Sequence, residues 1–204
     1  MNVLIILLIF LGGVRCNLNI NKEPVLVSDE FAKHIANDNK KIKVAWHTED
    51  GDLLINEEYI NSISEPEKAV LAYAVVVYEQ LCGEHKGKSQ GKELGCEMLS
   101  MLNLESKCSA NHLNFLSEWY KGDDETLTMI HQCTILNNTS IRQVALRELY
   151  ITTSKSTISL LCKVSSININ KPNYLRKWSV EEVFEVKNEQ IKLIDRNVIH
   201  GMNK

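Results

Sequence analysis

The sequence predicts an α+β domain in which N-terminal helices, with an early β-hairpin, pack on one face of a C-terminal antiparallel meander sheet. Over residues 28–134 the apolar side chains recur mainly at helical spacing. From Ile141 the period changes to two, and short connections join the alternating segments over 141–197. No internal repeat or low-complexity linker interrupts residues 28–204, so we expect them to form one domain.

The first 16 residues are an apolar leader. Val3–Phe10 is an unbroken apolar run of about the length of a signal-peptide h-region, and a membrane-spanning helix needs roughly 20 such residues. We therefore expect a signal peptide that exports the chain to the periplasm, the envelope or the exterior, with only a transient membrane contact. Two fates of Cys16 stay open. Cleavage after Cys16 would put Val14 and Cys16 at the processing positions, whereas lipidation of Cys16 would follow Arg15, which fits such a site poorly.

Turn and capping residues mark the elements that follow the leader. Asn17–Pro24 is polar and without periodicity, and we expect a flexible lead over residues 17–27. A serine then caps a short helix over Asp29–Ala36. Apolar and other residues alternate over Ile42–Trp46, and an Asp-Gly pair precedes Leu53–Ile55, which together predict a hairpin.

The clearest helix signal is a capping box at Ser64–Glu67, with proline in the first turn. We expect this helix to run to about Cys82 and, because it has almost no polar face, to be packed on most sides. The sequence predicts three further helices: Gly122 closes the second, and acids stand at the start of the third. They are Glu93–Leu104, Ser109–Tyr120 and Asp123–Cys133.

Alternation in the last third of the chain predicts four strands. They are Gln143–Thr152, Thr157–Ile167, Leu175–Lys187 and Gln190–Arg196. The first segment also fits helical spacing after a cap at Ser140, and we favour the strand.

The segment Trp178–Asp195 resembles the last hairpin of the nuclear-transport-factor-like, cystatin-like group of α+β folds. The resemblance rests on alternating residues around a polar Asn188-Glu189 turn and covers about the last quarter of the chain. It implies a curved sheet that wraps helices around a pocket. That scaffold hosts small enzymes, ligand binders and protein-interaction modules alike.

Five cysteines remain after Cys16, so an oxidising compartment permits at most two disulfides and leaves one thiol. Cys162 occupies alternate positions with Ile158, Leu160 and Val164, which places it on the core face of a strand and predicts a buried, inert thiol. The other four lie in the helical half. The disulfides that would close the shortest loops are Cys82–Cys96 and Cys108–Cys133, although the sequence leaves other pairings open.

A zinc site is the alternative to these disulfides. Cys108 and His112 stand at i, i+4 on one helical face, and His131 and Cys133 flank a single residue, which gives a possible Cys2His2 set. Because thiols in an exported protein usually oxidise, we favour the disulfides and expect no metal or other cofactor.

Glu182 is the candidate for acid–base chemistry. Alternation places it on the same strand face as four apolar residues, and a carboxylate in such surroundings can act as an acid or base of raised pKa. These residues are Trp178, Val180, Phe184 and Val186. The alternative is that Glu182 reaches solvent, or pairs with Arg147 or Arg176.

Composition and missing motifs narrow the function. The net charge of −3 comes from 26 acids and 23 bases without a basic block, which argues against a nucleic-acid partner. A nucleophile elbow and a Walker motif are both missing from the sequence. We therefore predict an exported, non-catalytic binding protein of the cell envelope or exterior, such as an inhibitor or immunity-type protein, whose partner is another protein or a small ligand. A small enzyme or ligand binder with a sheet-and-helix pocket, and a zinc-stabilised interaction module, are the alternatives.

Overall fold

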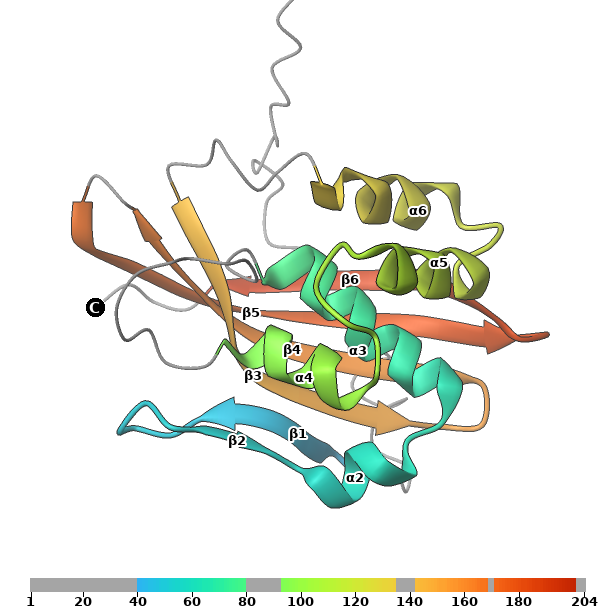
Figure 1. The fold of residues 1–204 in the computed structure, drawn as a ribbon, viewed down its shortest axis with the longest axis horizontal. Coiled ribbons are helices and arrows are strands. Elements are labelled where there is room, and N and C mark those ends of the chain that lie inside the picture. The colour runs from blue at the N-terminus through green and yellow to red at the C-terminus, as the bar shows by residue number, and fades with distance from the viewer. Residues whose placement is uncertain (1–39, 80–92, 135–141, 169–170, 201–204) are drawn as a thin grey trace, which may run out of the picture. The chain divides into compact units, whose positions relative to one another are not determined.

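A computed structural model describes residues 40–79, 93–134, 142–168 and 171–200, all within one unit, and shows a six-stranded antiparallel sheet with helices on one face (Figure 1). The strand order is β2-β1-β3-β4-β5-β6, so the early hairpin extends the C-terminal meander. The predicted α+β class and its arrangement are confirmed. The leader, the polar lead and the Asp29–Ala36 helix fall outside the described residues. Among the helices that are described, none has the length and apolar character to span a membrane.

Six strands build the sheet. They are β1 Ile42–His47, β2 Leu53–Ile55, β3 Arg142–Thr153, β4 Thr157–Asn168, β5 Lys171–Lys187 and β6 Gln190–His200. The segment with the ambiguous period is strand β3, as favoured. Its buried Leu146 and Leu149 are three residues apart because a β-bulge interrupts the register between Leu146 and Glu148. Regular alternation is therefore interrupted once within β3, between Leu146 and Leu149.

The four helices predicted within the described residues are all present, but each is shorter than predicted. The described helices are α2 Glu57–Ser62, α3 Glu65–Tyr78, α4 Leu94–Met101, α5 Ala110–Trp119 and α6 Asp124–His131, followed by the 3-10 turn η1 Gln132–Thr134. The short α2 was not predicted, because six residues give no periodic signal; Asn56 Oδ1 caps it by accepting from Tyr59 N at 3.1 Å. The α3 capping box is present at Ser64 and Glu67.

Helix α3 ends at Tyr78, four residues before the predicted end at Cys82. Glu79 has an extended backbone, with φ −112° and ψ 114°, so the helix cannot continue through it. Its buried carboxylate accepts a hydrogen bond from Leu146 N, 3.3 Å from Glu79 Oε2, at the β3 bulge. This contact joins the end of α3 to the irregular point of the sheet.

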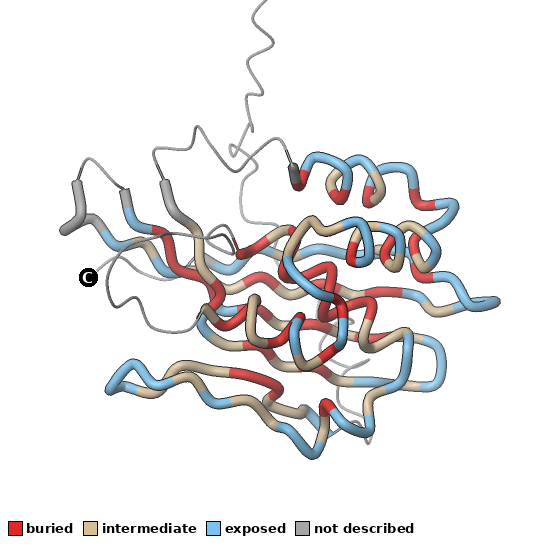
Figure 2. Tube along the Cα trace, viewed as in Figure 1, coloured by how far each residue is buried: buried red, intermediate tan, exposed pale blue. Residues whose placement is uncertain are grey.

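The core lies between the sheet and the helices, and α3 passes through its centre (Figure 2). Seven consecutive α3 residues, Ala69–Val75, have no exposed surface, which confirms a helix packed on most sides. Tyr73 of this run is 5.5 Å from Tyr120 and 5.4 Å from Phe184, measured between ring centroids, in tilted and edge-on arrangements. These three rings connect α3, the end of α5 and β5.

The sheet side opposite α3 to α6 is called the outer face below. One row of directly paired residues crosses all six strands on it. The row is Leu54, Trp46, Glu148, Lys163, Ser179 and Ile199. Its two ends are exposed aliphatic side chains, with Leu54 44% and Ile199 49% exposed.

Candidate functional site

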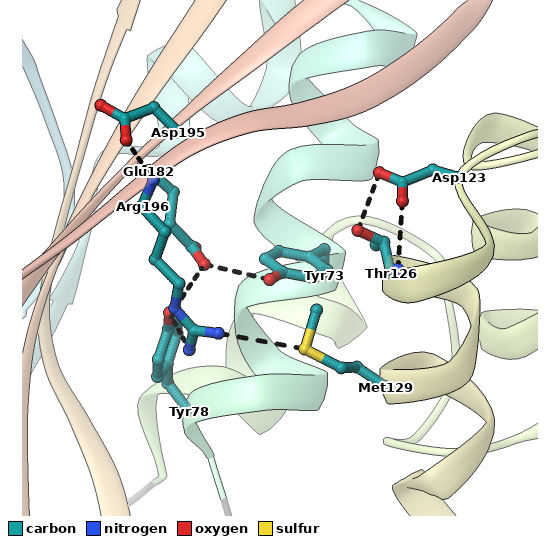
Figure 3. A network of polar contacts seen from close by, with 8 residues as sticks. All are labelled: Tyr73, Tyr78, Asp123, Thr126, Met129, Glu182, Asp195 and Arg196. Carbon is teal, nitrogen blue, oxygen red and sulfur yellow. Dashed lines mark hydrogen bonds and ion pairs between the residues drawn. The ribbon is translucent and has the colours of Figure 1, made fainter. Parts of the chain in front are cut away.

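Glu182, the predicted acid–base residue, is completely buried beneath α3 (Figure 3). Alternation along β5 places it on the same face as the buried Val180 and Phe184, as the sequence predicts. The Tyr73 hydroxyl on α3 donates a hydrogen bond to Glu182 Oε1 at 3.0 Å. The carboxylate is therefore part of the contact between the sheet and the central helix.

The cation that pairs with Glu182 is Arg196 of β6, and not Arg147 or Arg176 as the sequence suggested. Arg196 lies directly opposite Glu182 in the β5–β6 ladder, and its Nε is 3.3 Å from Glu182 Oε1. The same guanidinium donates from Nη2 to the Tyr78 hydroxyl at 2.9 Å. The network thus joins α3, β5 and β6 through one buried oxygen atom, Oε1 of Glu182.

Burial raises the pKa of Glu182, although the Arg196 charge and the hydroxyls of Tyr78 and Tyr73 act in the opposite direction. Burial likewise raises the pKa of Tyr73. Glu182 has no exposed surface, so a substrate could not reach its carboxylate in this conformation. The geometry supports a structural role for the network and lends no support to acid–base catalysis by Glu182.

A second polar contact attaches α6 to the edge strand, and Figure 3 shows the Asp123–Thr126 part of it. Asp123 caps α6, with Oδ1 accepting from Thr126 N at 3.2 Å and Oδ2 accepting from the Thr126 hydroxyl at 2.9 Å. Asp123 Oδ2 also accepts from Leu193 N of β6 at 3.0 Å. This acid is therefore a structural group as well.

The structure confirms the predicted Cys108–Cys133 disulfide, whose Cα atoms are 5.8 Å apart. Cys96 is also disulfide-bonded, while its predicted partner Cys82 lies outside the described residues, so that pairing stays a prediction. Cys162 is a free thiol with no exposed surface, as its place on the core face of β4 predicts.

The zinc alternative built on Cys108, His112, His131 and Cys133 is wrong, because the disulfide uses both sulfurs. Both ring nitrogens of buried His112 also have partners: Nε2 lies 3.2 Å from the Ala72 carbonyl oxygen and Nδ1 accepts from Cys108 N at 3.3 Å. The described ranges contain no group of three or more His, Cys, Asp or Glu side chains placed to hold a metal ion.

A pocket of about 430 Å³ opens between the β1–β2 turn and the strands β3 to β5. Residues of the turn, Thr48, Glu49 and Gly51, form one side. Two members of the outer-face row, Glu148 and Lys163, line it from the sheet. It is called the turn pocket below.

The bulge in β3 gives the turn pocket a cation that strand alternation would not supply. Leu146 and Leu149 are both fully buried, so the two residues between them, Arg147 and Glu148, lie toward the outer face. Arg147 is exposed and lines the pocket together with Lys177 of β5. The spacing of residues in the sequence does not indicate the bulge. The sequence therefore suggests Arg147 only as a partner of Glu182.

Glu148 is already neutralised by its neighbours. Its Oε2 is 3.0 Å from Lys163 Nζ and 3.7 Å from Lys43 Nζ, and it accepts a hydrogen bond from the Tyr150 hydroxyl. Partial burial acts to raise the pKa of Glu148, but these hydrogen bonds and charges outweigh it and lower the pKa. The hydrogen bond to Glu148 raises the pKa of Lys163 in turn.

Three lysines also surround the ring of Tyr150 on this side of the sheet. The Nζ atoms of Lys41, Lys43 and Lys163 are 4.7, 5.6 and 5.6 Å from its centroid. Within the part of the chain that the structure describes, neither Arg147 nor Lys177 has an ion-pair or hydrogen-bond partner. These two cations are therefore available to a ligand.

Comparisons with protein families, with curated proteins and with solved structures found no match for this chain.

Proposed function

We propose that this chain is an exported, non-catalytic binding protein of the cell envelope or exterior that holds a partner protein on its outer face. The observation that carries the proposal is the contrast between the two sides of the sheet. On the helix side, Glu182 and His112 are buried in structural contacts. On the outer face, the turn pocket presents Arg147 and Lys177 without internal partners among the described residues.

Oxidised cysteines support the export part of the proposal. Cys108, Cys133 and Cys96 are all disulfide-bonded, and stable disulfides are typical of proteins that fold outside the cytosol. The apolar leader over residues 1–16 supports the same compartment. Mass spectrometry of the native protein tests this part. A chain that still begins at Met1 with all its thiols reduced would contradict it.

The surface chemistry of the outer face favours a protein partner. The row across the sheet has exposed aliphatic side chains at both ends, Leu54 and Ile199, with charged and aromatic residues between them. Interfaces between proteins combine apolar and aromatic contacts with polar and charged groups. The likeness to the nuclear-transport-factor-like group, which would also suit an interaction module, stays a prediction.

A capture experiment with matched variants tests the binding part. The immobilised mature chain is incubated with extracellular or envelope proteins of its source, and the retained protein is identified and its Kd measured. Ile199→Glu should weaken the complex at least tenfold, roughly 1.4 kcal/mol, because it places a charge in the contact. Val198→Glu is the control, because Val198 is 43% exposed on the same strand but pairs with the buried Val180 on the helix side of the sheet. Failure to capture any partner, or equal loss by both variants, would contradict binding on the outer face.

A further inference from the structure

We propose that the turn pocket binds carboxylate side chains of an acidic segment of the partner protein, with Arg147 and Lys177 as the recognition residues. This inference rests on the proposed function, because it identifies the chemistry of the partner that the outer face holds.

The position of Arg147 is the first step. The β3 bulge turns this side chain to the outer face beside the row position of Glu148, at the mouth of a pocket of about 430 Å³. β-bulges recur next to functional sites because they redirect a side chain in this way. The guanidinium is a planar fork whose N–H groups match the two oxygens of a carboxylate.

Lys177 supplies the second cation from another strand. In the β4–β5 ladder, Lys163 pairs with Ser179 and Ser165 pairs with Lys177, so the two lysines lie on neighbouring rows of one face. Three of these four residues, Lys163, Lys177 and Ser179, line the turn pocket together with Arg147. Lys163 is bound to Glu148 at 3.0 Å, whereas Lys177 has no partner among the described residues.

The charge balance of the pocket selects an anion of moderate charge. Its lining contains the cations Arg147, Lys163 and Lys177 and the acids Glu49 and Glu148. The lining thus has three cations against two acids, an excess of one positive charge, whereas the whole chain has a net charge of −3, and this local excess favours an anion.

The two acids in the lining argue against a densely charged polymer such as a sulfated glycan. Such a chain would bring several anions close to Glu49 and Glu148 at once, and like charges repel. A peptide presents one carboxylate at a time and places uncharged backbone between successive acids. The exposed Leu54, which belongs to the same outer-face row, also suits a peptide with apolar side chains.

The test is direct binding of a labelled peptide that alternates glutamate with serine, against the same peptide with glutamine, measured by fluorescence anisotropy on the full mature chain. The glutamate peptide should bind at least tenfold more tightly. Arg147→Gln and Lys177→Gln should each weaken it about tenfold, since each removes a charge-assisted hydrogen bond. Arg147→Lys should have an intermediate effect, because it keeps the charge and loses the fork. Higher salt should weaken binding through screening.

Lys155→Gln and Lys187→Gln are matched controls, because Lys155 is exposed in the β3–β4 turn and Lys187 is exposed at the end of β5, so the same charge is removed outside the pocket lining. They should change Kd by less than about threefold. Thermal unfolding checks that each variant is folded. If Arg147→Gln does not fold, Arg147→Lys and Lys177→Gln decide the question.

The two proposals fail in different ways. If both peptides bind equally, or heparin binds tightly while the glutamate peptide does not, acidic-segment recognition is overturned. If a captured partner depends on Ile199 but tolerates Arg147→Gln and Lys177→Gln within about threefold, the inference falls and the proposed function stands. If no partner is captured, the proposed function falls, and the glutamate peptide alone cannot rescue it.

Discussion

Replacing Arg196 by methionine should destabilise the protein because it leaves the Glu182 carboxylate without its cation. Glu182 has no exposed surface, and Arg196 Nε is 3.3 Å from its Oε1. Breaking a fully buried ion pair from one side costs about 3–5 kcal/mol. The Arg196 side chain is 36% exposed, so solvent screens part of this interaction and we expect about 2–3 kcal/mol. For a chain of this size that corresponds to a fall in Tm of roughly 5–10 °C.

The pH dependence of stability tests whether the buried charge of Glu182 causes the loss of stability in Arg196→Met. Burial raises the pKa of Glu182, and loss of the Arg196 charge should raise it further. For an acid whose folded pKa lies above its unfolded value of about 4.3, stability falls as pH rises through that interval. The stability deficit of Arg196→Met should therefore be smaller at pH 5 than at pH 8, where the carboxylate is charged.

Urea unfolding of four proteins at both pH values provides the assay: wild type, Arg196→Met, Glu182→Gln and the double variant. The double variant should recover stability relative to Arg196→Met alone, because glutamine carries no charge and can still accept from the Tyr73 hydroxyl. An equal deficit at pH 5 and pH 8, or a double variant no more stable than Arg196→Met, would refute the assignment. Retained partner binding by folded Glu182→Gln would in addition separate this network from recognition.

Three further perturbations test the helical layer. Gly95→Ala should cost about 1–3 kcal/mol of unfolding free energy in a urea titration, because its Cβ would stand 2.9 Å from Glu79 Cγ, and Glu79 is held in place by the sheet. An unchanged midpoint would mean that α4 can shift freely. Replacing both Cys108 and Cys133 by alanine should cost about 3.5 kcal/mol for a closure of 25 residues, and a loss below about 1 kcal/mol would contradict this. Burial lowers the pKa of His112 to about 4, so the neutral folded ring should make stability fall as pH drops from about 6.5 to 4. His112→Gln should flatten that slope in urea titrations across this range, and an unaltered slope would exclude His112 as its source.

Local sequence signals predicted much of this fold because the physical constraint was itself local. The capping box at Ser64 specifies the start of α3 within a few residues, since its hydrogen bonds join neighbouring positions. Alternation placed Glu182 and Cys162 on the buried face for the same reason. The end of α3 could not be predicted, because Glu79 leaves the helix in order to bind Leu146 N, a residue 67 positions away.

The candidate site escaped prediction because both of its features depend on register between strands. Glu182 meets Arg196 because the β5–β6 ladder pairs them. That pairing depends on one extra residue in β6, Ile194, which lies between the residues paired with Phe184 and Val183. Arg147 reaches the outer face because one residue is inserted in β3. A shift by a single residue moves a strand side chain to the opposite face, so no amount of alternation within one strand reveals which cation meets which acid. The same dependence makes the proposed site testable. Deleting Arg147 should remove the bulge and keep Glu148 opposite Lys163 on the outer face, between the buried Leu146 and Leu149, so that regular alternation returns. The deletion should therefore weaken recognition as much as Arg147→Gln does, and a deletion variant with full affinity for the glutamate peptide would contradict the role of Arg147.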